Sequence, residues 1–117
     1  MTDRPYEKLI VWQEAYRLCL WVYDLVKDFP EHEKFGLTIQ MRKSSYSVHM
    51  NIAEGNSRRT SKDKRHFMAM AKGSLEELHS QLRMAKDLRY LSSDIFLHGD
   101  DHINRASFLL YRFRESL

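Results

Sequence analysis

The sequence predicts an all-α protein that folds as one domain, residues 1–117, into an antiparallel, up-down-up-down bundle of four helices. Three observations support this prediction. Glycine and proline number only 4 and 2, so few positions interrupt a helix. Apolar residues recur at steps of three and four along successive segments, which is the period of a helical face. Short connections join these segments, and short connections favour antiparallel neighbours.

The first predicted helix runs from Val11 to about Asp28, and Pro30 ends it. Its main apolar face consists of Val11, Ala15, Leu18, Val22, Leu25 and Phe29. A second apolar row lies beside the first and consists of Trp12, Tyr16, Cys19, Tyr23 and Val26. The two rows cover about half of the circumference, more than the roughly 100° that a surface helix needs.

The second predicted helix begins near Phe35 and has two apolar faces. One face consists of Leu37, Met41, Ser45, Val48 and Ile52, and the other of Ile39, Tyr46, Met50 and Ala53. Between them runs a polar row of Gln40, Ser44, Ser47, Asn51 and Glu54. Two apolar faces, the wide apolar arc of the first helix, and Trp21 on the polar side of that helix together predict a homo-oligomer.

The end of the second helix carries an unusual carboxylate. Gly55 is predicted to end the helix in the left-handed conformation. Glu54 then lies at the negative end of the helix dipole, where a carboxylate needs a partner. The candidates are Arg58 or Arg59, the amides that start the third helix, and a basic group from a neighbouring subunit. We therefore predict that Asn51, Glu54 and Gly55 form a structural clamp on the turn, without a catalytic role.

The third predicted helix has Ser61 as its N-cap and extends as far as Leu91. Its core face consists of Phe67, Ala71, Leu75, Leu78, Leu82 and Ala85. Antiparallel packing on the second helix brings Gly73 level with Ser44, where small residues allow a close approach. The same packing places Gln40 near Glu76 and Glu77.

The fourth predicted helix begins after Ser92 or Ser93, either of which is a suitable N-cap. Its apolar stripe consists of Ile103, Ala106, Leu110, Phe113 and Leu117. Gly99 is expected to weaken the first turns by up to about 1 kcal/mol relative to alanine.

Positive charge is concentrated in the middle of the chain. Residues 35–93 contain 11 basic and 5 acidic side chains, whereas the segments on either side are slightly acidic. The densest run stands where the third helix starts and consists of Arg58, Arg59, Lys62, Lys64 and Arg65. Cationic side chains and free helix N-terminal amides both suit phosphate oxygens. We predict that this run contacts RNA or DNA, reinforced by Arg42 and Lys43. The alternative is a solvated loop whose arginines only neutralise Glu54.

No catalytic or cofactor-binding motif occurs, so we expect no enzyme activity, cofactor or metal. The strongest contrary candidate is a metal site at His98 and His102, one helical turn apart, with Asp94 and Asp101 nearby. A glycine and the fraying start of a helix argue against this site. Cys19 is the only cysteine, which excludes an internal disulfide and favours a packed thiol.

The sequence also bears on the compartment. No apolar run approaches the roughly 20 residues that span a bilayer, and the N-terminus lacks the apolar core of a signal peptide. We therefore expect a cytoplasmic protein with no membrane partner.

Three stretches, "LIVWQEAYRL", "VYDLVKDFPEHEKFGLTIQMRKSSYSVHMNIAEG" and "GSLEELHSQLRMAKDLRYL", resemble the bacterial four-helix bundle proteins first noticed as open reading frames in intervening sequences of 23S ribosomal RNA genes. The resemblance covers about residues 9–91. It implies a left-handed four-helix bundle that assembles into a homopentamer. The family is similar in fold to the accessory variability protein of diversity-generating retroelements, a basic pentamer that binds a reverse transcriptase and nucleic acid.

Taken together, these patterns favour a non-catalytic, homo-oligomeric helical bundle that contacts RNA or DNA through a basic surface. The resemblance implies a role as an accessory to a nucleic-acid enzyme such as a reverse transcriptase. The alternative is a structural or protein-interaction oligomer with no nucleic-acid role. A third class is a small metalloenzyme at His98 and His102, which bound metal would reveal.

Overall fold

The computed structural model describes residues 3–117 and contains four α-helices, with no strand in this range. The α-helices are α1 (Ile10–Leu25), α2 (Leu37–Asn56), α3 (Ser61–Asp87) and α4 (Ser93–Glu115). Three short 3-10 helices are η1 (Pro5–Lys8), η2 (Val26–Asp28) and η3 (Glu31–Glu33). The all-α prediction is confirmed. Within the described residues, no helix is both long enough and apolar enough to cross a membrane.

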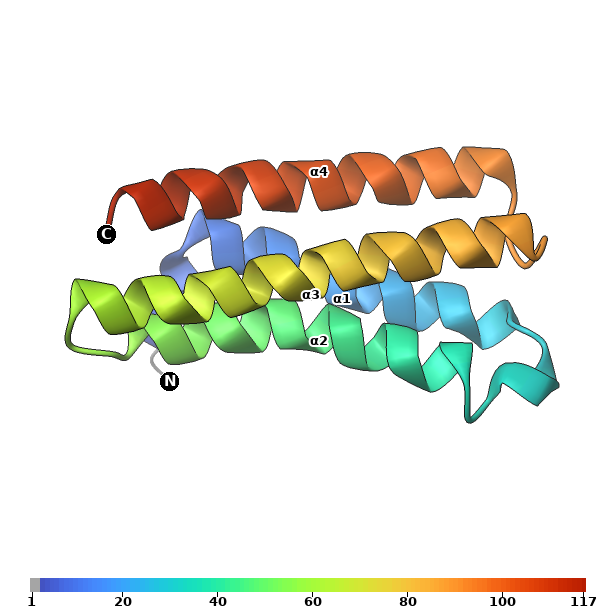
Figure 1. The fold of residues 1–117 in the computed structure, drawn as a ribbon, viewed down its shortest axis with the longest axis horizontal. Helices are drawn as coiled ribbons and strands as arrows, with labels where there is room; N and C mark the ends of the chain where they lie inside the picture. Colours follow the sequence, from blue (N-terminus) through green and yellow to red (C-terminus); the bar gives the residue numbers. More distant parts are fainter. Residues whose placement is uncertain (1–2) are drawn as a thin grey trace.

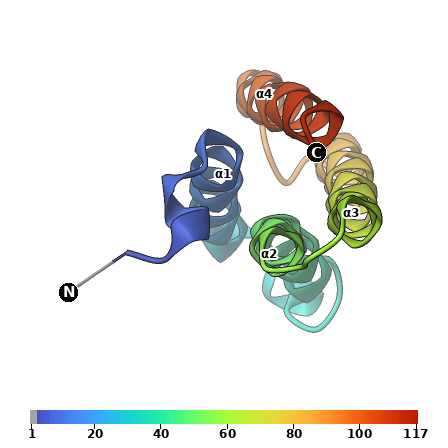
Figure 2. The ribbon, with the colours of Figure 1, turned by 90° about the vertical axis from the view of Figure 1, so that its left-hand side faces the viewer.

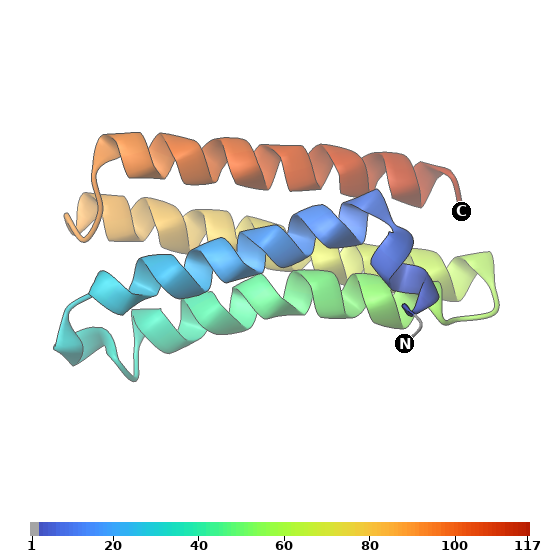
Figure 3. The same ribbon diagram turned by 180° about the vertical axis from the view of Figure 1, so that it is seen from behind.

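The four long helices pack side by side around one core. Both α1 and α3 contact α2 and α4, so the helices follow one another around a ring in chain order (Figure 2). The turn between α2 and α3 lies at the same end of the bundle as the start of α1 and the end of α4 (Figures 1 and 3). We call this the turn end of the bundle.

Most of the predicted apolar faces form the core. The buried core side chains of the four α-helices include Val11, Ala15, Leu18, Val22, Met41, Val48, Ile52, Ala71, Leu75, Leu78, Leu82, Ala85, Ile103, Ala106 and Leu110. On α3, Met68 is fully buried and takes the place predicted for Phe67, which is only partly buried. The second apolar row of α1 divides, because Cys19 is buried whereas Tyr16 and Tyr23 remain exposed.

Gly55 does not end α2 in the left-handed conformation, contrary to the prediction. The helix continues through it to Asn56, and no glycine among the described residues has a positive φ. Gly55 is buried where α2 meets α3. A Cβ added there would lie 2.7 Å from Phe67 Cβ and 3.3 Å from the main-chain oxygen of Lys64. Glycine is therefore needed for close packing of two helices.

Two further glycines also differ from expectation. Gly73 is exposed, with nothing within 4 Å of an added Cβ, so it brings no helices together. The contact near Ser44 is instead a hydrogen bond, which its Oγ donates to Glu77 Oε1 over 2.7 Å. Gly99 is buried beneath Trp21 of α1, whose Cη2 would lie 2.7 Å from an added Cβ. Trp21 is thus a contact between α1 and α4 and does not lie on an open polar face.

The starts of α3 and α4 are fixed by hydroxyl caps. Thr60 is the N-cap of α3, and its Oγ1 accepts the N–H of Asp63 over 3.1 Å. The predicted cap, Ser61, is the first helical residue instead. Ser92 caps α4, and its side chain accepts the N–H of Ile95.

The expected helix end with one residue in the left-handed conformation is found after α3, and not at Gly55. Arg89 has a φ of 66°, and the N–H of Tyr90 donates to the carbonyl of Ala85 over 2.9 Å. This bond is typical of a Schellman motif. The motif stops α3 short of the predicted limit at Leu91.

Candidate nucleic-acid interface

The predicted phosphate contacts gather at the turn end of the bundle. They occupy the connection between α2 and α3 and the first turns of α3, and we call residues 58–65 the basic turn. Asp63 is the only acidic residue in this stretch, and its N–H is held by the Thr60 cap. The fold therefore presents these cations together on one short segment.

Arg58 is held by two neighbours. Its Nη2 pairs with Glu54 Oε1 one helical turn earlier, and its guanidinium lies over the Phe67 ring, 4.7 Å from the centroid. Of the partners considered for Glu54, the structure thus selects Arg58. The Glu54 side chain is 50% exposed, so the pair lies at the surface, where an ion pair contributes little.

Asn51 does not contact the turn, contrary to the prediction. Its side-chain amide donates to the carbonyl of Ser47 over 2.8 Å, one turn back in α2. Gly55, as described above, allows α2 and α3 to pack closely. The turn is therefore held by helix packing, by the surface ion pair and by a bond from Lys64 to the Asn56 carbonyl, and the polar row of α2 contributes only Glu54.

Main-chain oxygens orient two further cations of the basic turn. Lys64 Nζ donates to the carbonyl of Asn56 over 3.0 Å, and Arg65 Nη1 donates to the main-chain oxygen of Leu117 over 3.1 Å. Neither side chain has an ion-pair partner within residues 3–117. Each is therefore positioned without an Asp or Glu side chain to neutralise its charge.

Arg59 and Lys62 are the most available cations of the basic turn. Both are exposed, and no other described residue engages them in an ion pair or a side-chain hydrogen bond. Because their side chains are already solvated and unpaired, an incoming phosphate would not have to displace a protein carboxylate.

Arg42 and Lys43 do not join the basic turn, contrary to the expected reinforcement. They lie in α2 roughly 24 Å before Arg58, at a rise of 1.5 Å per residue. The guanidinium of Arg42 packs over the Tyr23 ring, 5.5 Å from its centroid, and is half-buried. Lys43 is exposed but isolated from the run.

Two arginines at the turn end were not predicted from the sequence to belong to the basic surface. Arg112 and Arg114 occupy the last turn of α4, and the bond from Arg65 to Leu117 brings that end beside the start of α3. Neither arginine has an ion-pair partner in the described part of the chain. Basic residues in the final turn of a helix commonly stabilise the negative end of the helix dipole, so the sequence pattern alone did not indicate that they belong to a phosphate-binding surface.

Both His98 and His102 pack against Trp21, but only His102 also contacts Glu14. The His98 ring packs against Trp21 with centroids 5.6 Å apart, whereas His102 Nε2 lies 3.2 Å from Glu14 Oε1. Burial lowers the pKa of His102, although the Glu14 carboxylate opposes this shift. Among the described residues, no three His, Cys, Asp or Glu side chains are grouped so that they could hold a metal ion.

Glu14 is a buried carboxylate that sequence reasoning also missed. Its side chain is 9% exposed and pairs with Arg17 at 3.0 Å and with Arg105 of α4 at 3.4 Å, in addition to His102. These partners offset the desolvation of the carboxylate and tie α1 to α4. The available signal was its position three residues after Val11, on the apolar face of the helix.

Cys19 is packed inside the bundle. It is buried, and Ser45 Oγ donates to its Sγ over 3.5 Å. Burial raises the pKa of the Cys19 thiol, which disfavours the nucleophilic thiolate. The environment is therefore that of a structural thiol.

Comparisons with known proteins agree with this architecture. The chain is similar to a solved structure of a protein of unknown function from the S23 ribosomal protein family of Bacteroides thetaiotaomicron, with a TM-score of 0.84 and 17% sequence identity. The match covers 91% of this chain and 96% of that one, and at this identity it shows a shared fold. The comparison with curated proteins finds no match. The family model of the 23S rRNA-intervening sequence protein matches residues 7–112, so the chain belongs to that family.

Proposed function

We propose that this protein is a non-catalytic, homo-oligomeric bundle that contacts RNA or DNA through its turn end. The observation that carries the proposal is the group of cations gathered there from two helices. Arg58, Lys64 and Arg65 are oriented by protein contacts, Arg59 and Lys62 remain unpaired within the described residues, and Arg112 and Arg114 extend the surface. Such an arrangement favours binding to the phosphate backbone of a nucleic acid, because phosphates that the cations neutralise release their bound counterions.

The test removes the two unpaired cations. Arg59→Gln combined with Lys62→Gln should leave helical content unchanged, weaken binding to RNA and DNA alike, and reduce the salt dependence of binding by about 1 unit of log–log slope per lost contact. A matched control, Lys27→Gln with Lys72→Gln, removes the same charge from exposed sites away from the turn end. An equal effect of both pairs would point to net charge alone and would contradict a defined interface.

The proposal includes the antiparallel, up-down-up-down arrangement that the helix pattern predicts, together with the left-handed bundle and the homopentamer that the family resemblance implies. Large apolar side chains that remain exposed on α1 and α2 outside the groove described below support self-association, namely Ile10, Leu20 and Ile39. Light scattering should give about five times the 14.0 kDa of one chain. A mass near 14.0 kDa at micromolar concentration would contradict the assembly.

An accessory role beside a nucleic-acid enzyme such as a reverse transcriptase rests on the same resemblance, and this role together with a cytoplasmic location completes the proposal. The competing proposal is a structural or protein-interaction oligomer without nucleic acid, which the exposed apolar side chains equally favour. An oligomer that binds neither RNA nor DNA at low salt would decide for that competitor.

A further inference from the structure

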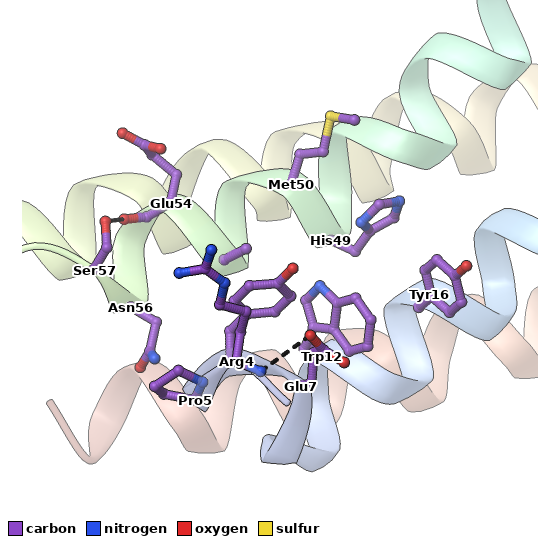
Figure 4. Close-up of a pocket in the computed structure, with 12 residues that line it drawn as sticks. Arg4, Pro5, Glu7, Trp12, Tyr16, His49, Met50, Glu54, Asn56 and Ser57 are labelled. Carbon is purple, nitrogen blue, oxygen red and sulfur yellow. Dashed lines mark hydrogen bonds between the residues drawn. The ribbon is translucent and has the colours of Figure 1, made fainter. Parts of the chain in front are cut away.

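An open groove of about 1070 Å³ lies beside the basic turn, between the N-terminal segment and the second half of α2 (Figure 4). η1 and the start of α1 form one wall. α2 forms the other wall, with Met50 and Ala53 among its lining residues. No part of the proposed phosphate surface accounts for this groove.

The wall formed by η1 and α1 is a continuous aromatic stack. The rings of Trp12 and Tyr16 are parallel within 12°, with centroids 4.8 Å apart, and Tyr6 meets Trp12 edge-on at 5.1 Å. His49 of α2 meets the edge of this stack, 5.3 Å from Tyr16. Tyr16 lines the groove and is still 40% exposed, so its ring can accept another planar group. Rings of this kind stack on any nucleobase, because every base has a π-face.

The polar features of the groove suit an uncharged planar ligand. Burial lowers the pKa of His49, which favours the neutral imidazole beside the stack. The indole nitrogen of Trp12 is buried and has no hydrogen-bond acceptor within the described residues. Glu7 and Arg4 line the groove as an acid and a base, and the main-chain N–H of Arg4 donates to Glu7 Oε1 over 3.1 Å. Glu54 lines the groove as well, but Arg58 pairs with it, so no single charge sign dominates the groove.

The groove leads directly to the basic turn. Its far end is lined by Asn56 and Ser57, and the next residues in the chain are Arg58 and Arg59. Lys64 also reaches this point, since its Nζ donates to the carbonyl of Asn56. An aromatic platform and a set of cations thus lie side by side, which is the combination found in proteins that bind single-stranded nucleic acid.

We propose that this groove receives an unpaired base of a single-stranded nucleic acid, which stacks on Tyr16 while the adjoining phosphates contact the basic turn. This inference rests on the proposed function and adds a specificity to it. A base inside a duplex is already stacked on both faces and is not free to enter the groove. The protein therefore prefers single strands to duplexes of the same sequence.

The test uses short RNA and DNA strands that carry the fluorescent base 2-aminopurine, each measured alone and annealed to its complement. Wild-type protein should quench the single strands and bind them more tightly than the duplexes. Tyr16→Ala should weaken single-strand binding by roughly 5- to 150-fold and abolish the quenching. Tyr16→Phe should retain both properties, because it keeps the ring. Tyr23→Ala, a control at an exposed tyrosine of α1 outside the groove, should behave as wild type.

Each contrary outcome has a distinct meaning. If Tyr16→Ala binds single strands as wild type does, while Arg59→Gln with Lys62→Gln loses binding, the phosphate surface stands and the groove inference is wrong. If wild type binds no nucleic acid, the proposed function fails as well. A changed oligomeric mass for Tyr16→Ala would assign the groove to a subunit contact and overturn the inference.

A second variant keeps the test independent of the folding of Tyr16→Ala. Met50 is 54% exposed and lines the α2 wall, so Met50→Glu places a carboxylate in the groove without disturbing the core. Single-strand binding should fall with this variant, whereas Met50→Gln should bind more tightly than Met50→Glu. Unchanged binding by Met50→Glu would also overturn the inference.

Discussion

Replacing Gly55 by alanine is expected to push α2 and α3 apart beside the basic turn. The new Cβ would lie 2.7 Å from Phe67 Cβ, whereas two carbon atoms in contact are normally about 3.5 to 4.0 Å apart. Because Phe67 Cβ and the main-chain oxygen of Lys64 are fixed to the backbone of α3, the helix itself must shift. Overpacking of this kind destabilises by about 1 to 3 kcal/mol.

Gly73→Ala is the matched control for this experiment. Both glycines lie inside helices, so alanine improves helix propensity at each by up to about 1 kcal/mol. Gly73→Ala meets nothing within 4 Å and should therefore stabilise the protein by that amount. Gly55→Ala should range from neutral to about 2 kcal/mol destabilising, and the difference between the two variants isolates the packing penalty.

Urea unfolding followed by circular dichroism measures both variants. A single protein concentration should be used throughout, because the stability of an oligomer depends on concentration. If Gly55→Ala stabilised the protein as much as Gly73→Ala, the close contact between α2 and α3 would be refuted.

The remaining predictions concern charge. Glu54→Gln should lower the unfolding free energy by only about 0.3 to 0.5 kcal/mol, because the Glu54–Arg58 pair is exposed. A loss above about 1 kcal/mol in urea unfolding would contradict this and would support the structural clamp predicted from the sequence. Burial lowers the pKa of His49 in the folded state. As the pH falls through 6.5, the unfolded chain therefore binds more protons than the folded protein does. Stability at pH 5.5 should therefore be lower than at pH 7.5, and His49→Gln should reduce that difference, whereas an unchanged difference would contradict a buried neutral imidazole.

The core could be predicted from the sequence because each helix carries a continuous apolar stripe at helical spacing. On α1 the three- and four-residue steps select Val11, Ala15 and Leu18, and all of them are buried. The role of Gly55 could not be predicted in the same way. A glycine near a helix end serves equally well in a left-handed cap or in a close helix contact, and only the position of the next helix decides between them.

The candidate site was predictable only in its local part. The basic turn is one continuous segment, so its five cations were evident, and Glu54 to Arg58 is an ordinary spacing for a helical ion pair. Arg112 comes from a distant segment that the fold brings to the same end. The groove arises because η1 folds back across α2, and its two walls bring together aromatic residues far apart in the chain, such as Trp12 and His49.

The most direct test of the central claim is the salt dependence of binding by the wild-type protein. Affinity for a short RNA or DNA strand is measured by fluorescence anisotropy from low to moderate salt. If Arg59, Lys62 and their oriented neighbours neutralise phosphates, the logarithm of the association constant should fall linearly with the logarithm of salt concentration, with a slope of about −2 or steeper. A slope near zero, or no binding at the lowest salt, would contradict a phosphate-binding surface at the turn end.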